Sequence, residues 1–239
     1  MRARRKLRKM EITEVDGETG MISKRGYAGS MRIEFATFGK LEERTAFVVR
    51  RFSRYLQDSV LDVGCYEAPM RRMLNGVRYC GIDITGAPDV RFDLDSGRPL
   101  PVADRSYRCV VCVEVLEHLD HLHTMFGELV RASSEYPIVS LPNPWRDARR
   151  MIERGKGQPA LYGLPLERPI DRHKWFFNFT EVHDYLIHAA KTHGVEILEM
   201  FATEQHRPAI VRAVRHLRYP GERYFNRYVQ TVWTAMRRR

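Results

Sequence analysis

Acidic side chains recur where short apolar segments end, and their spacing suits the binding of a nucleoside. Asp62 precedes Gly64, and Asp83 follows Gly64 by 19 residues. An acid about 20 residues after a glycine turn is the spacing that proteins use to hold ribose hydroxyls. Asp93 and Glu114 follow the next two apolar segments. We therefore expect these carboxylates to form one binding site.

The glycine turn departs from the dinucleotide-binding pattern at two positions. A pyrophosphate needs glycine at the second motif position so that the backbone can approach it closely. Tyr66 stands at that position, and Ala68 stands at the third. The bulky Tyr66 favours a nucleoside without phosphates, of which S-adenosylmethionine is the common one. A nicotinamide-dependent oxidoreductase stays an alternative.

The cysteines and histidines predict no metal site. Cys109 and Cys112 are three residues apart in an apolar segment, so on a strand they point to opposite faces. The spacing of His118, His121 and His123 fits a strand-to-helix turn better than a ligand set. We assign His118 as a candidate catalytic base on the substrate side.

Apolar patterns place these residues on alternating strands and helices. The segments predicted as strands are residues 59–63, 78–84, 90–94, 108–115, 137–141 and 195–201. The segments predicted as helices are residues 41–57, 69–74, 121–133 and 180–193. Such alternation predicts an α/β fold with a mostly parallel sheet, whose ligands bind at the carboxyl ends of the strands.

In combination, these motifs resemble the class I S-adenosylmethionine-dependent methyltransferases, and most closely their type 11, MetW-like subgroup. The resemblance runs from about residue 41 to 201 and is carried by residues 60–65 (VLDVGC), 81–84 (GIDI), 93–115 and 116–119 (LEHL). It implies a Rossmann-like three-layer sandwich with a seven-stranded, mostly parallel sheet and one antiparallel strand near the C-terminus. It also implies S-adenosylmethionine as the cofactor.

The resemblance assigns roles along the strand ends. Asp62 and Gly64 would surround the methionyl group, Asp83 would bind the ribose, and Asp93 would face the adenine. The residues expected to bind the cofactor are Asp62, Gly64, Cys65, Tyr66, Asp83, Ile84, Asp93, Leu94 and Glu114. Asn143 and His173 are candidate substrate residues, in segments that also resemble the subgroup. Because family members usually have glycine where Tyr66 and Ala68 stand, a catalytically degenerate S-adenosylmethionine-binding module stays an alternative.

Basic residues are concentrated at the two ends of the 239-residue chain, whose net charge is +10. Residues 1–10 carry six Lys or Arg, and residues 201–239 carry nine Arg against two Glu. The remaining residues, 11–200, hold 25 basic and 28 acidic side chains. This distribution favours an anionic partner, either a membrane surface or a nucleic acid, with a solvated surface as the alternative.

The same patterns predict the organisation of the chain. Residues 1–40 form a flexible or loosely packed basic arm. Residues 41–239 form the methyltransferase domain, with an irregular insertion at 142–175 and a basic C-terminal segment at 202–239. Residues 224–236 form either the last strand or a surface helix, and the resemblance favours the strand.

Composition predicts the cellular location of the protein but does not identify the molecule that accepts the methyl group. The chain has no run of 18 apolar residues, no apolar segment after its basic start, and four cysteines. We therefore expect reduced thiols and a cytoplasmic location, with peripheral membrane association as a further expectation. The acceptor is a small molecule, a lipid-linked molecule or a nucleic acid, methylated on oxygen, nitrogen or carbon.

Overall fold

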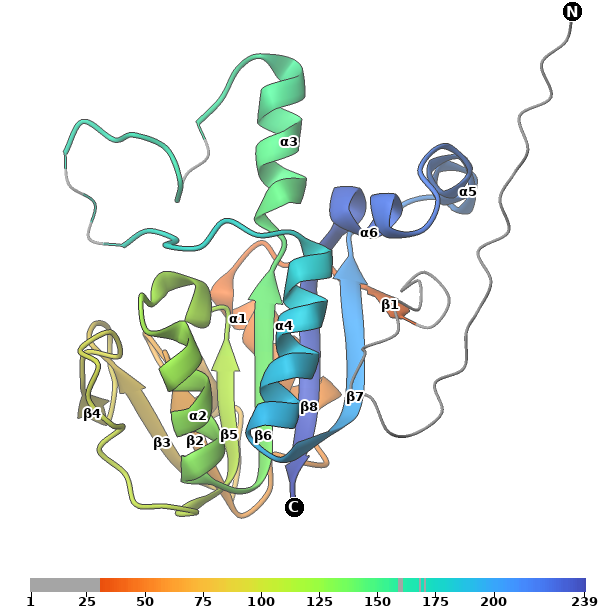
Figure 1. The fold of residues 1–239 in the computed structure, drawn as a ribbon. Coiled ribbons are helices and arrows are strands. Elements are labelled where there is room, and N and C mark those ends of the chain that lie inside the picture. Colours follow the sequence, from red (N-terminus) through yellow and green to blue (C-terminus); the bar gives the residue numbers. More distant parts are fainter. Residues whose placement is uncertain (1–30, 159–160, 168, 170) are drawn as a thin grey trace, which may run out of the picture.

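The computed structural model describes residues 31–158, 161–167, 169 and 171–239. One eight-stranded sheet has the order β1-β7-β8-β6-β5-β2-β3-β4 (Figure 1). Its strands are β1 (Arg32–Phe35), β2 (Ser59–Val63), β3 (Arg78–Asp83), β4 (Val90–Arg91), β5 (Tyr107–Val113), β6 (Ser133–Pro142), β7 (Val195–Glu204) and β8 (Val229–Arg238). The helices are α1 (Leu41–Arg51), α2 (Leu122–Ala132), α3 (Pro144–Arg154), α4 (Phe179–Thr192), α5 (Ala209–Arg218) and α6 (Glu222–Tyr228), with 3₁₀ turns η2 (Pro69–Arg72) and η3 (Leu116–His118).

The sheet confirms the predicted architecture but corrects its number of strands. β8 runs antiparallel between β6 and β7, and the other strands are parallel. The predicted count of seven is wrong because β1 adds an eighth strand, paired with β7 from Arg32↔Phe201 onward. This strand lies within residues 1–40. The four residues of β1 are too few to show the two-residue period of a strand in the sequence. They pair with β7 because its edge would otherwise be unpaired.

Alternating side chains of the strands separate two apolar layers. Leu61 and Val63 of β2 pack in the layer that includes α2 and α4, whereas Val60 packs in the layer that includes α1. Figure 1 shows α2 and α4 together on one face of the sheet. Cys109 belongs to the α1 layer and Cys112 to the α2 layer, so the prediction that they point to opposite faces is confirmed.

Three helices lie beyond the carboxyl ends of β6 and β7 (Figure 1). α3 occupies part of the segment 142–175, for which an irregular insertion was predicted. Pro144 begins this helix, and Gly155 ends it in a left-handed conformation with φ 62°. α5 and α6 connect β7 to β8. β8 confirms the strand prediction for residues 229–236, of which residues 231–236 are buried without interruption, so both faces of the strand are covered. The strand prediction is wrong for residues 224–228, which belong to α6.

Residues 1–30, most of the predicted basic arm, lie outside the described residues. Within the described part of the chain, no helix is both long enough and apolar enough to cross a membrane.

Candidate active site

The loop after β2 forms the first wall of the site. Asp62 is buried, and its Oδ2 accepts a hydrogen bond of 2.7 Å from the Tyr79 hydroxyl. Burial raises the pKa of Asp62 to about 6, against the opposing effect of this hydrogen bond. Gly64 follows with φ +81°, and a Cβ atom there would lie 2.2 Å from Cγ2 of Val115. Only glycine therefore fits this turn without displacing Val115.

Two non-glycine residues continue this loop in left-handed conformations. Tyr66 and Ala68 both have φ 47°. Such a conformation costs roughly 1–2 kcal/mol for a residue with a Cβ atom. The Tyr66 side chain is 50% exposed. The loop backbone nevertheless keeps its shape, because Tyr66 N–H donates to Asp83 Oδ2 at 2.8 Å.

Asp83 lies at the end of β3, beside the β2 loop. Its Oδ1 accepts from the backbone N–H of Thr85 at 2.9 Å. Oδ1 also accepts from the Thr85 hydroxyl at 3.3 Å, whereas Oδ2 accepts from Tyr66 N–H and has a second lone pair for a ligand's hydroxyl group. Ile84 is exposed next to it. The structure thus brings together the residues that the sequence predicted from Asp62 to Ile84.

The segment after β4 adds Asp93 and Leu94 to the same sheet edge. Asp93 is exposed, and its Oδ1 accepts from the backbone N–H of Asp95 at 2.9 Å. Leu94 is buried in the α2 layer. Since β4, β3, β2 and β5 are consecutive neighbours in the sheet, the strand ends that carry the predicted residues lie in one row.

Glu114 follows β5 and joins three elements. Its Oε1 accepts from the Thr231 hydroxyl at 2.7 Å, and its Oε2 pairs with Arg44 of α1. Its φ of 52° is also left-handed. Sequence analysis missed Arg44, because an arginine in the first turns of an amphipathic helix carries no distinctive signal.

A hollow between α1 and the β2 loop is lined by the groups that a zwitterionic amino acid requires. Arg44 supplies a cation, Asp62 a carboxylate, and Gly64 backbone groups. Cys65 also lines the hollow. Burial raises the pKa of its thiol to about 12, so the thiol is uncharged at pH 7.

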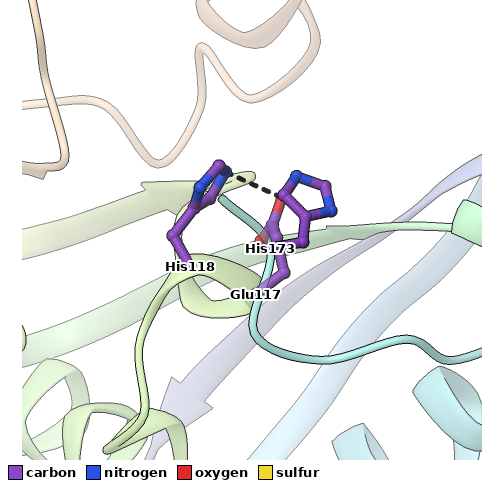
Figure 2. A group of neighbouring side chains, drawn as sticks. All are labelled: Glu117, His118 and His173. Carbon is purple, nitrogen blue, oxygen red and sulfur yellow. Dashed lines mark ion pairs between the residues drawn. The ribbon is translucent and has the colours of Figure 1, made fainter. Parts of the chain in front are cut away.

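A second group of polar side chains lies beside the end of β5 (Figure 2). Glu117 and His118 come from η3, and His173 comes from the segment before α4. Glu117 Oε1 lies 3.9 Å from His118 Nε2 and 4.0 Å from His173 Nε2. Burial raises the pKa of Glu117, while burial and the neighbouring His118 lower the pKa of His173 to about 4. Sequence analysis named His118 and His173 separately, and only the fold brings them together.

Asn143 is fully buried between β6 and α3. Its side-chain NH₂ donates to the carbonyls of Phe225, Asn226 and Val229, at 3.0–3.2 Å. These bonds hold the α6–β8 connection beside the end of β6. Its predicted contact with substrate stays a prediction, and the amide is already used in this structural role.

The family-model comparison identifies a methyltransferase domain over residues 36–199. The chain belongs to this methyltransferase family. S-adenosylmethionine is its cofactor. The match does not distinguish the type 11, MetW-like subgroup, which stays a prediction.

Solved structures share the fold of this methyltransferase at low sequence identity. An S-adenosylmethionine-dependent methyltransferase from Archaeoglobus fulgidus is 17% identical, with a TM-score of 0.50 over 84% of this chain and 96% of that one. One from Mesorhizobium loti is 15% identical, with a TM-score of 0.50 over 84% and 99%. The [4+2]-cyclase SpnF is 13% identical, with a TM-score of 0.50 over 87% of both chains. A search of curated protein sequences finds no match.

The residues of the methyltransferase fit its cofactor. Gly64 has no side chain to obstruct the hollow that Arg44 and Asp62 line, and Asp83 Oδ2 keeps a lone pair at the neighbouring strand end. Arg44 and Asp62 would hold the methionyl carboxylate and amino group, and Asp83 the ribose. The bound cofactor supplies an activated methyl group.

Proposed function

We propose that this protein transfers the methyl group of S-adenosylmethionine to a phosphate-bearing acceptor at an anionic membrane surface. Bound S-adenosylmethionine would supply its methyl group to an oxygen, nitrogen or carbon of the acceptor, and S-adenosylhomocysteine would be the second product. The positive sulfur already activates the methyl group, so the protein mainly aligns the acceptor and excludes water.

The proposal of a phosphate-bearing acceptor rests on an arginine-lined hollow beyond the carboxyl ends of β6 and β7. Its arginines are Arg146, Arg149, Arg150, Arg207, Arg215 and Arg227. Among the described residues of its wall, Glu204 is the one acid, and it pairs with Arg215 at 3.1 Å. Asp147 and Glu153 neutralise Arg146, Arg149 and Arg227 in part. Six guanidinium groups thus face three carboxylates.

This excess of positive charge leaves donor groups unused. The Nε atoms of Arg149 and Arg227 are buried without a hydrogen-bond partner among the described residues. Burial lowers the pKa of Arg146, and the neighbouring Arg150 guanidinium lowers it further. A bound phosphate would accept these hydrogen bonds and offset the repulsion, because guanidinium groups match phosphate oxygens in geometry and charge.

Helix α5, which forms part of the wall of the same hollow, is the reason for proposing that the phosphate belongs to a membrane. Ile210, Val214 and Leu217 are spaced by four and three residues on this helix, and they are 71%, 57% and 86% exposed. Basic residues accompany them, including Arg212 and Arg218. An exposed apolar face flanked by arginine is typical of helices that lie on anionic membranes. Free cysteines support a cytoplasmic location for this surface.

Vesicle sedimentation tests the membrane surface. The full chain should sediment with phosphatidylglycerol vesicles but not with phosphatidylcholine vesicles, since each Lys or Arg near an anionic surface contributes about 1 kcal/mol. The double variant Val214→Ser/Leu217→Ser should lose most of this binding. Ile187→Ser is the matched control, because Ile187 is an exposed apolar residue of α4.

Three outcomes would contradict the membrane proposal. The first is an equal loss of sedimentation in both variants, and the second is no binding to either kind of vesicle. The third is a single-stranded RNA that binds more tightly than the vesicles, with an affinity that falls steeply as salt rises.

A catalytically degenerate binding module is the second candidate, and the left-handed Tyr66 and Ala68 favour it. Calorimetry should detect binding of S-adenosylmethionine and none of NAD⁺. Tight NAD⁺ binding would instead support the oxidoreductase alternative. S-adenosylhomocysteine formed with phosphate-bearing lipids supports the enzyme, whereas cofactor binding with no turnover on lipids, RNA or small metabolites supports the module.

A further inference from the structure

Glu117, His118 and His173 present three electron-pair donors to one another. Their ligand atoms all lie within 4.8 Å of one another. The two Nε2–Oε1 separations of 3.9 and 4.0 Å are too long for hydrogen bonds, which need about 2.7–3.2 Å. Figure 2 shows the two imidazole rings and the carboxylate converging on one small region.

Hydrogen bonds on the far side of each ring determine which nitrogen carries the proton. The Tyr162 hydroxyl donates its hydrogen to the Trp175 carbonyl at 2.8 Å, so its oxygen accepts from His173 Nδ1 at 2.7 Å. His118 Nδ1 lies 2.6 Å from Asp171 Oδ1, and an ionised carboxylate only accepts. When the rings are neutral, the proton of each is therefore on Nδ1, and each Nε2, 3.9–4.0 Å from Glu117 Oε1, carries a lone pair.

Glu117 needs a positive partner. Its side chain is 1% exposed, and its Oε2 is buried without a hydrogen-bond partner in the described part of the chain. A buried carboxylate is costly unless a cation or donors compensate it. The carboxylate accepts from the backbone N–H of Glu117. The two Nε2 atoms, 3.9 and 4.0 Å from Oε1, carry no proton when the rings are neutral. Glu114 adds negative charge nearby, and Arg44 on α1 is already paired with Glu114.

The segment that carries His173 is fixed against η3. Lys174 N–H donates to the Glu117 carbonyl at 2.8 Å, and Trp175 Nε1 donates to the Leu119 carbonyl at 2.7 Å. The Lys174 ammonium also pairs with Asp95 and Asp120. The rings are thus held in place before any ligand arrives.

We propose that Glu117, His118 and His173 bind a divalent transition-metal ion. Imidazole nitrogens and a carboxylate suit Zn²⁺, Mn²⁺, Fe²⁺ or Co²⁺. Ligand atoms about 2.1 Å from a tetrahedral ion lie about 3.4 Å apart. The two Nε2–Oε1 separations therefore have to shorten by about 0.5–0.6 Å, and the third pair of ligand atoms lies within 4.8 Å. Asp171 and Tyr162 act as the outer partners that orient metal-binding histidines.

The ion changes the role of His118. A histidine whose Nε2 binds a metal cannot also accept a proton there, so the ligand role replaces the base role predicted from the sequence. The sequence-based prediction of no metal site considered His118 with His121 and His123, its neighbours in the chain. The fold instead pairs His118 with the distant His173.

Titration of the chelator-treated full chain with Co²⁺ tests this proposal without cofactor or acceptor. We expect visible absorption bands that saturate at one ion per chain, with half-saturation at micromolar Co²⁺ or below. Glu117→Gln and His173→Gln should weaken binding at least about 100-fold. Tyr162→Phe should weaken it about 10-fold, since it removes only the outer partner of His173. His121→Gln is the matched control and should bind as the parent chain does.

Two results would overturn the proposal. One is the absence of saturable Co²⁺ and Mn²⁺ binding below 1 mM, Mn²⁺ being followed by electron paramagnetic resonance. The other is unchanged metal affinity in Glu117→Gln, His173→Gln and Tyr162→Phe. Circular dichroism and S-adenosylmethionine binding check that each variant is folded, and Tyr162→Phe keeps the test valid if the two ligand variants do not fold. Methyl transfer is not measured, so this outcome is independent of the proposed function.

Discussion

Gly64, in the loop after β2, is the residue for which the structure gives the most specific prediction of a substitution's effect on stability. In Gly64→Ala, the new Cβ would retain φ near +81° and lie 2.2 Å from Cγ2 and 2.9 Å from Cγ1 of Val115. The left-handed conformation costs alanine about 1–2 kcal/mol. Displacing Val115 adds about 1–3 kcal/mol, as in other overpacked sites. Together they predict a loss of about 2–5 kcal/mol in the free energy of unfolding.

A double-mutant cycle separates the two causes. Val115→Ala removes both Cγ atoms and costs about 1–2 kcal/mol, roughly 0.8 for each carbon. In that background, Gly64→Ala should cost only the conformational part, because the nearest remaining atom is the Val115 Cβ at 3.1 Å. The coupling free energy should therefore be about 1–3 kcal/mol, measured by urea unfolding. Additivity within about 0.5 kcal/mol would refute the steric argument, and an unaltered midpoint for Gly64→Ala would refute both parts.

Three further predictions concern the same loop. Asp83→Asn should weaken S-adenosylmethionine binding by about 2–4 kcal/mol in calorimetry, because bonds to a charged acceptor are worth roughly 1.5–3 kcal/mol each; an unchanged dissociation constant would remove Asp83 from the site. Asp62→Asn should stabilise the fold at pH 8 by about 1–3 kcal/mol, since burial raises the folded pKa to about 6 from 3.8 and the wild type loses stability as pH rises through that interval. This gain should disappear toward pH 4 in urea unfolding, and a gain independent of pH would contradict the assignment. Tyr66→Gly should keep or improve cofactor affinity and relieve about 1–2 kcal/mol of left-handed strain; a large loss of affinity would make the Tyr66 side chain a cofactor contact.

The sequence by itself determined the parts of this protein that depend on local patterns. β2 has the bounds that its apolar run predicted, and the acids from Asp62 to Glu114 lie in one row at the strand ends. The reason is that parallel strands joined by right-handed crossovers bring their carboxyl ends to one edge. The residue types at those ends therefore predicted a nucleoside site, and the family resemblance that they carry implied S-adenosylmethionine before any distance was known.

Tertiary structure alone decided the rest, because it depends on residues far apart in the chain. The four-residue β1 is a strand only because β7 offers a free edge, and its own sequence is too short to show a period. His173 reaches Glu117 and His118 only after the segment before α4 docks on η3. The net charge of the basic C-terminal segment likewise follows from the sequence, but the positions of its arginines relative to one another do not. Packing of α3, α5 and α6 gathers its arginines with those of α3 around one hollow, while Arg238 instead donates to the carbonyls at the end of α2. Charge is a property of composition, but the distance between charges is set by the fold.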